Sequence, residues 1–168
     1  MATVFWDRKG VLLIEFLPDV TDTGRKYINI VNGYRYFDTV IKLKQAIKMK
    51  RPEMLSNGVF LIQNNDRPRK HELVQHFIDG FGWKLFPHPA YSPDTALSDF
   101  HTFPGLKNDL EGKGFPIEKS LRTAVNRSFA KMDVEWYCTG IDELVSRYNK
   151  CLDLNGDYII EKEFESYF

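Results

Sequence analysis

The chain has 168 residues, of which 43% are hydrophobic, 14% aromatic and 27% charged. These proportions are ordinary for a folded globular protein, and the length predicts one domain. Lys and Arg number 23, as do Asp and Glu, so the formal net charge at pH 7 is zero. Because sequence-independent affinity for nucleic acid comes from Lys and Arg, this balance excludes a chain that is basic throughout.

No apolar stretch approaches the roughly 20 residues that a membrane helix needs, so we expect no membrane partner. The N-terminus lacks a basic region followed by an apolar stretch, which indicates an intracellular chain without a secretory signal. The two cysteines, Cys138 and Cys151, fall in one helical-looking region and form no disulfide framework. Reduced, half-buried thiols are the expected state.

The first third of the chain predicts a hairpin followed by a helix. Strand-like residues 3–6 and 11–17 are separated by a short polar connection that ends in Gly10, which is typical of a β-hairpin. Residues 18–32 are polar and are predicted to form a loop. Asn32 can cap a helix that ends before Pro52.

The rest of the chain alternates strands and helices. Residues 59–62 are continuously apolar, which is typical of a strand buried on both faces. A helix is predicted from Pro68 to Gly80, and a short strand over residues 83–86. Further helices are predicted over residues 95–110, 117–131 and 134–150. This order predicts an α/β domain with a mixed sheet.

Two blocks carry the most information. The first reads Gln63-Asn-Asn-Asp-Arg-Pro68 and the second reads His88-Pro-Ala-Tyr-Ser-Pro-Asp-Thr-Ala-Leu-Ser-Asp-Phe-His101. They resemble the two downstream catalytic blocks of mariner-family DNA transposases. The catalytic aspartates of those blocks correspond here to Asn64 and Asp99. Positions 65 to 98 lie between them, which is the family's spacing of 34 residues.

The resemblance extends over nearly the whole chain, since further matches occur in the same order. They include residues 5–10, 32–36, 82–83, 103–107 and 154–159. The family's catalytic domain implies a ribonuclease-H-like α/β fold over residues 1–168, with a mixed sheet flanked by helices. The family's first aspartate lies on a central strand that would precede Met1. We therefore expect that strand, and the helix-turn-helix region that reads transposon ends, to be absent.

Members of this family cut and join DNA with two divalent ions, typically Mg²⁺, held by three carboxylates. The resemblance assigns Asp99 to the third carboxylate, as a catalytic and metal-binding residue. Asn64 stands where the second carboxylate belongs and offers an amide oxygen without charge. With two of three aspartates missing, we expect Mg²⁺ not to be bound productively and the chain not to cleave DNA alone.

Other carboxylates and the histidines favour ordinary structural roles. Asp66 is expected in a turn or helix cap, Asp7 in the hairpin turn, and Asp94 in a loop or cap. No histidine pair has the spacing and flanking Glu of a zinc hydrolase, so partly buried imidazoles with satisfied hydrogen bonds are expected. The four histidines are His71, His76, His88 and His101.

A local basic surface is compatible with the zero net charge. Arg67, Arg69 and Lys70 adjoin the first block and are the candidate DNA-binding residues. The lysines and arginine of residues 42–51 form a second cluster, which is typical of a solvated helix face.

Three functions remain open. The leading one is a transposase-derived nuclear domain that binds DNA by descent, with an ancestral role in DNA transposition and integration. An active metal-dependent endonuclease or transposase, completed by a residue from another chain or exon, is the alternative. The third is a transposase domain fused to another module, as in the mariner-fused histone-lysine methyltransferase. A missing central strand also predicts open sheet edges that recruit a second copy or a partner, unless the two edges pair directly.

Overall fold

The computed structural model describes residues 2–16, 21–22, 25–26, 33–63, 71–86, 88–89 and 92–159. Its elements, in chain order, are β1 (Ala2–Asp7), β2 (Gly10–Phe16), β3 (Thr21–Asp22), β4 (Arg25–Lys26), α1 (Gly33–Lys50), α2 (Pro52–Asn57), β5 (Phe60–Ile62), α3 (Glu72–Gly80), β6 (Lys84–Phe86), the π-helical segment η1 (Ser98–Thr102), α4 (Phe103–Leu110), α5 (Glu118–Lys131) and α6 (Val134–Asp153). Within these ranges, no helix combines the length and the apolar character needed to span a bilayer.

Strands β1 and β2 form the predicted antiparallel hairpin, with Asp7 opposite Gly10 across the two-residue turn. The Asp7 carboxylate accepts hydrogen bonds from the Lys9 amide at 2.8 Å and from Arg51 Nε at 3.0 Å. Gly10 has a φ of 121°, a conformation that favours glycine. Asp7 is therefore a turn residue that ties the hairpin to the end of α1, as the sequence predicts.

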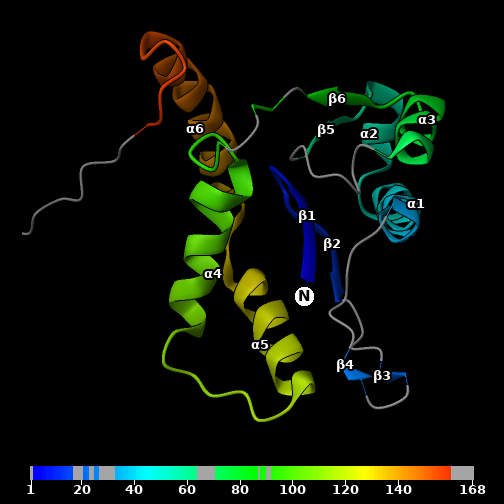
Figure 1. The fold of residues 1–168 in the computed structure, drawn as a ribbon, viewed down its shortest axis with the longest axis vertical. Coiled ribbons are helices and arrows are strands. Elements are labelled where there is room, and N and C mark those ends of the chain that lie inside the picture. Colours follow the sequence, from blue (N-terminus) through cyan, green and yellow to red (C-terminus); the bar gives the residue numbers. More distant parts are fainter. Residues whose placement is uncertain are drawn as a thin grey trace, which may run out of the picture.

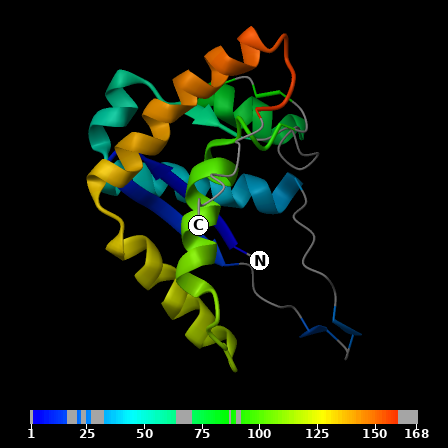
Figure 2. The same ribbon diagram turned by 90° about the vertical axis from the view of Figure 1, so that its left-hand side faces the viewer.

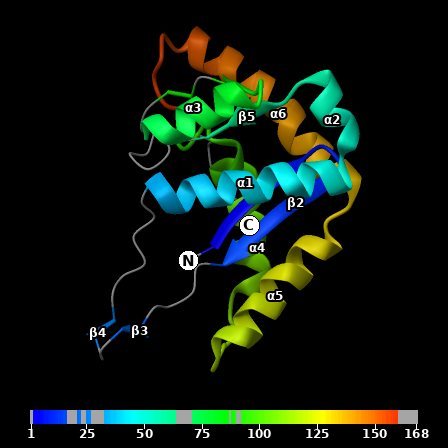
Figure 3. The same cartoon turned by 90° about the vertical axis from the view of Figure 1, so that its right-hand side faces the viewer.

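The hairpin lies between two layers of helices (Figure 1). Helix α1 packs against β2 on one side, while α5 contacts β2 and α6 contacts β1 on the other. Figure 2 and Figure 3 view the molecule from these two sides, with α4, α5 and α6 nearest in one and α1 and α3 nearest in the other. The N-terminal half of the chain thus supplies the hairpin and one layer, and the C-terminal half supplies the other.

The described strands form three two-stranded sheets. β1 pairs with β2 antiparallel, β5 pairs with β6 parallel, and β3 pairs with β4 in a short ladder within the predicted loop of residues 18–32. In the described ranges no ladder joins the β1–β2 pair to the β5–β6 pair. Direct pairing of the two open edges, an alternative that the sequence left open, is therefore not seen in this part of the chain.

One hydrophobic core nevertheless joins the two strand pairs. Helix α1 contributes Tyr36, Val40, Leu43 and Ile47, whose spacing of three or four residues places them on one helix face. The core is completed by Leu12, Val59, Leu61, Val74, Ile78 and Trp83. Both pairs thus contribute side chains to one core that α1 helps to build, although no ladder in the described ranges joins them.

A second packing unit, aromatic in character, lies between β1 and α6. The Trp6 ring centroid is 5.5 Å from that of Tyr137 and 6.0 Å from that of His101, whose ring lies 4.0 Å from that of Trp136. The Tyr137 hydroxyl donates to the Phe129 carbonyl at 3.1 Å. Burial raises the pKa of Tyr137 to about 12, so this donor stays protonated and keeps α6 attached to α5.

Several boundaries differ from the sequence prediction, and proline accounts for two of the differences. Pro52 ends α1 as predicted, but it also begins the short helix α2, because proline is favoured at the first helical position. The predicted helix over residues 95–110 is interrupted: η1 precedes α4, and the Phe103 amide donates to the Ser98 carbonyl five residues earlier. Pro104, which has no amide hydrogen, follows directly and cannot continue the regular ladder.

We expect Gly140→Ala to destabilise the fold by about 1–3 kcal/mol, because a Cβ there would lie 2.4 Å from the His101 ring. In an open helix the same change contributes up to roughly 1 kcal/mol of stability. Gly80→Ala, where a Cβ meets nothing within 4 Å, is the matched control and should be neutral or stabilising. Chemical denaturation measures the free energy of unfolding of both variants. A Gly140→Ala protein as stable as the unsubstituted chain would show that this contact does not constrain the fold.

Candidate functional site

The carboxylate of Asp99 is exposed on the second residue of η1, at the start of the helix that continues as α4. Its backbone amide donates to the Ala96 carbonyl at 2.8 Å. The π-type hydrogen bond from Phe103 to Ser98 widens this turn. Widened turns of this kind occur often at functional sites. The second sequence block therefore places its aspartate on an irregular turn and directs it to the surface.

Neighbouring contacts fix that turn. Trp6 Nε1 on β1 donates to Ser98 Oγ at 3.4 Å, next to Asp99 in the chain. The His101 imidazole, whose side chain is 11% exposed, lies 2.9 Å from the Trp136 carbonyl through Nε2. His101 is thus a partly buried imidazole with a hydrogen-bond partner, as predicted. Asp99 stands on a support that both β1 and α6 hold in place.

The segment before η1 is attached to α6 through Arg147. Arg147 Nη1 donates to the Asp94 carbonyl at 3.0 Å, and its guanidinium lies 4.0 Å from the centroid of the Phe100 ring. Asp94 Oδ2 accepts from the Ile159 amide at 2.9 Å, so Asp94 acts as the predicted loop residue. Sequence reasoning missed Arg147, because it lies outside both blocks and no local motif distinguishes it from other helix-surface arginines.

His88, the first residue of the second block, is half-buried and lies within electrostatic reach of the Asp99 carboxylate. Burial lowers the pKa of His88, while the carboxylates of Asp99 and Asp94 act in the opposite direction. The Tyr148 hydroxyl lies 3.5 Å from His88 Nδ1. The imidazole is therefore neutral at pH 7 and can take part in hydrogen bonding at the edge of the site.

The described part of the chain does not contain a cation site of the kind that the resemblance implies. No three His, Cys, Asp or Glu side chains gather there in a group that could hold a metal ion. Asn64 and the basic residues Arg67, Arg69 and Lys70 lie outside the described residues. Their roles stay predictions. The described site consists of one exposed carboxylate on a stiff support beside a neutral imidazole, which does not fit a pair of divalent ions.

Comparison with known proteins establishes the lineage. A family model described as transposase (partial DDE domain) matches residues 1–57. The crystal structure of the catalytic domain of Mos1 mariner transposase superposes with a TM-score of 0.85 at 32% identity, covering 94% of this chain and 74% of that one. The chain belongs to the mariner transposase family. This mariner relationship confirms the ribonuclease-H-like α/β fold expected from the two sequence blocks.

The complete relatives are considerably longer. The mariner Mos1 transposase of Drosophila mauritiana is 32% identical over 161 residues, which are 95% of this chain and 44% of that protein. The histone-lysine N-methyltransferase SETMAR of Homo sapiens is 30% identical over 159 residues, 94% of this chain and 22% of that protein. The chain thus spans less than half the length of these relatives.

Further Mos1 structures show the metals that the mariner family uses. The catalytic domain was solved with Mg and with Mn, at TM-scores of 0.83 and 0.85. A paired end complex with Mn, of which this chain covers 44%, superposes at 0.84. Divalent metal use is therefore a property of the mariner family, and the residues around Asp99 must be judged against it.

We expect Asp99→Asn to lower the pKa of His88 further, because the change removes a carboxylate that raises it. The control is Asp38→Asn, which removes an exposed carboxylate from α1 and should leave the pKa of His88 unchanged. NMR titration of the imidazole protons measures the pKa of His88 in both variants. The lowered pKa also means that the unfolded chain binds a proton more readily. The stabilisation by His88 is therefore present above the ordinary histidine pKa of about 6.5 and is lost as pH falls below it. An unchanged or higher pKa in Asp99→Asn would contradict this electrostatic account.

Proposed function

We propose that this chain is a transposase-derived domain that associates with DNA and does not cleave it alone. The observation that carries this proposal is the presence of Asp99 in an otherwise well-matched block, together with an uncharged residue at Asn64. Support for the DNA partner comes from the family, since one Mos1 structure contains the left transposon end. We assign residues 1–168 to a single catalytic-type domain that acts on nuclear DNA.

The absence of cleavage follows from charge. Two divalent ions about 4 Å apart repel each other by about 4 kcal/mol even in bulk water, and by more in a less polar site. Three carboxylates offset that repulsion in the family, whereas Asp99 supplies one negative charge and Asn64 none. Mg²⁺ also gives up its bound waters reluctantly and favours anionic oxygen ligands. We infer that Mg²⁺ is not held productively by this chain alone.

DNA association, in contrast, does not require the metal. Arg67, Arg69 and Lys70 adjoin Asn64 in the sequence and can neutralise phosphates whether or not a cation is present. We propose that these three residues contact the DNA backbone beside Asp99. Such contacts position the DNA and do not read its sequence.

One observation favours the second candidate function, a nuclease completed by another chain. The contact from Trp6 to Ser98 places β1 beside η1, and in the described ranges β1 pairs only with β2. A strand added to the free edge of β1 would therefore run close to Asp99. If that strand carried a carboxylate, it would supply charge that this chain lacks.

We expect the purified 168-residue chain not to nick supercoiled DNA in Mg²⁺ or Mn²⁺, and Asn64→Asp not to restore nicking, because the substituted position and Asp99 provide two carboxylates where the family uses three. Gel analysis of plasmid nicking, with EDTA and Asp99→Ala as controls, measures this. Metal-dependent nicking that Asp99→Ala abolishes would overturn the proposal and support the nuclease. Nicking restored by Asn64→Asp would show that our account of the site is wrong.

We also expect the chain to self-associate, because among the described strands β1 pairs only with β2 and β5 only with β6, so each has an edge that can accept another strand. Sedimentation velocity over a hundredfold range of concentration should show a shift from monomer to dimer. A chain that stays monomeric throughout and unfolds in one sharp transition would exclude a homodimer built on these edges.

A further inference from the structure

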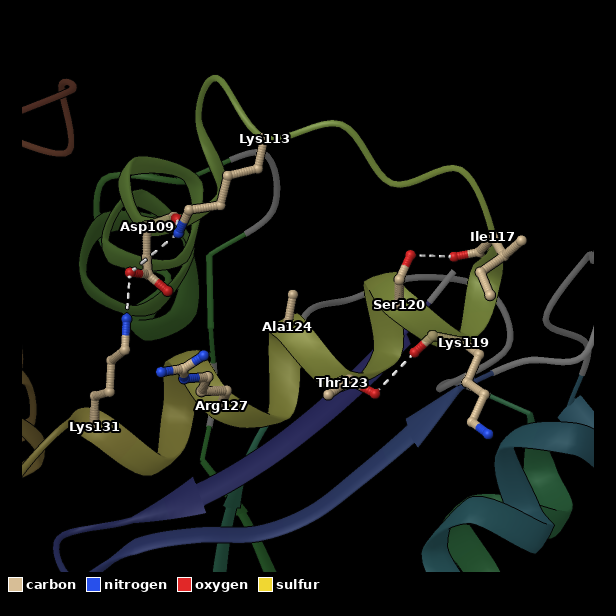
Figure 4. A pocket seen from close by; sticks show the side chains of 9 residues that line it. All are labelled: Asp109, Lys113, Ile117, Lys119, Ser120, Thr123, Ala124, Arg127 and Lys131. Carbon is tan, nitrogen blue, oxygen red and sulfur yellow. Dashed lines mark hydrogen bonds and ion pairs between the residues drawn. The ribbon is translucent and has the colours of Figure 1, made fainter.

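A second charged surface lies away from Asp99, where the end of α4 faces α5. It is a hollow of about 490 Å³ lined by four basic residues and one acidic residue. We call it the α4–α5 hollow. Figure 4 shows its side chains: Asp109, Lys113, Ile117, Lys119, Ser120, Thr123, Ala124, Arg127 and Lys131. Since the whole chain has no net charge, this local excess of positive charge requires an explanation.

The one acid of the hollow is already engaged. Lys131 Nζ on α5 lies 2.8 Å from Asp109 Oδ1, and Lys113 Nζ lies 3.6 Å from the same oxygen. The Lys131 ammonium lowers the pKa of Asp109, which therefore stays ionised. The ion pair with Lys131 links α4 to α5, whereas the one with Lys113 stays within the end of α4 and the turn that follows it. They also leave the hollow with a net positive charge.

The remaining cations, Lys119 and Arg127, face solvent. The ion pairs found in the described part of the chain include neither of them. They lie two helical turns apart on the stripe Lys119, Thr123, Arg127 and Lys131, in which each residue follows the last by four. At 1.5 Å per residue, their positions are about 12 Å apart along α5. One DNA strand advances about 3.4 Å per nucleotide, so this distance spans three to four phosphates.

The other groups of the hollow favour charge recognition alone. The Ser120 hydroxyl donates to the Ile117 carbonyl at 2.6 Å, and the Thr123 hydroxyl donates to the Lys119 carbonyl at 2.9 Å. Both hydroxyl hydrogens are therefore used within the helix. Ala124 and Ile117 add only small apolar surface. A ligand is recognised here by its repeated negative charge and not by base-specific hydrogen bonds.

We infer that the α4–α5 hollow binds the phosphodiester backbone of DNA through Lys119 and Arg127. This inference rests on the proposed association with DNA and adds a contact surface formed by α4 and α5. Two cations about 12 Å apart on one helix stripe match phosphates that repeat evenly along a strand, whereas an acidic peptide would present carboxylates at irregular spacing. The surface lengthens the DNA segment that the domain holds.

The test measures binding of the whole chain to a fluorescent 20-base-pair duplex of arbitrary sequence over a series of salt concentrations. The variant Lys119→Ala/Arg127→Ala removes both of these cations at exposed helix positions, where alanine supports the helix. The matched control is Lys48→Ala/Lys150→Ala, which removes two exposed lysines from α1 and α6. Circular dichroism confirms that both variants are folded.

We expect the hollow variant to lower the slope of log affinity against log salt by about two, and the control to leave it unchanged. Counterion release predicts that affinity falls roughly tenfold per lost contact at 0.1 M salt. Equal slopes for the hollow variant and the unsubstituted chain would overturn this inference and leave DNA association intact. If the unsubstituted chain binds no DNA, the proposed function fails as well. Binding of polyglutamate through the hollow, with no binding of duplex, would overturn it in favour of an acidic protein partner.

Discussion

The close approach of the His101 imidazole to the bare backbone of Gly140 determines how the second half of the molecule is assembled. A Cβ at Gly140 would lie 2.4 Å from that ring, so only glycine allows η1 to sit against α6 at this distance. The same imidazole stacks near Trp6 and reaches the Trp136 carbonyl. One contact therefore sets the relative positions of β1, η1 and α6. The orientation of Asp99 follows from it.

That support is the kind of structure on which an exact metal geometry depends, since ligands on stiff elements hold their positions within fractions of an ångström. Under the proposed function, this chain keeps the support and carries less negative charge beside it, since Asn64 stands where the family resemblance places a second carboxylate. The packing of the fold can be kept while the negative charge of the site is reduced, because the two depend on different atoms. The aromatic unit of β1 and α6 is stabilised by burial, whereas cation affinity depends on carboxylates that contribute little to the core. An asparagine at position 64 in place of a carboxylate, as we propose, removes charge and no part of the aromatic unit.

The sequence predicted β1, β2, β5, β6, most helices and the family, but not the short β3–β4 ladder or every boundary. The two blocks around Asn64 and Asp99 identified the fold, because their order and spacing are specific. The hairpin turn at Asp7 was predicted from local chemistry, since short polar turns depend on few residues. Helix α2, the π turn at η1 and the role of Arg147 were missed. Each depends on hydrogen bonds that periodicity does not encode, and the last also depends on contacts with a loop more than 50 residues away.

The charged residues were the hardest to interpret from sequence, and the structure shows why. Net charge is zero, yet charges group by where the helices meet and not by where residues stand in the chain. Arg122 pairs with Glu118 on the same helix and lies 4.9 Å from the Phe16 ring centroid, so its charge is used within the fold. Arg127, five residues later, faces the α4–α5 hollow instead. Two arginines of one helix thus have opposite roles, because a helix turns by about 100° per residue and presents them to different neighbours. A chain with zero net charge can therefore have a basic surface when its acidic side chains are engaged elsewhere in ion pairs. Affinity for a polyanion depends on the local excess of positive charge on that surface and not on the net charge of the chain.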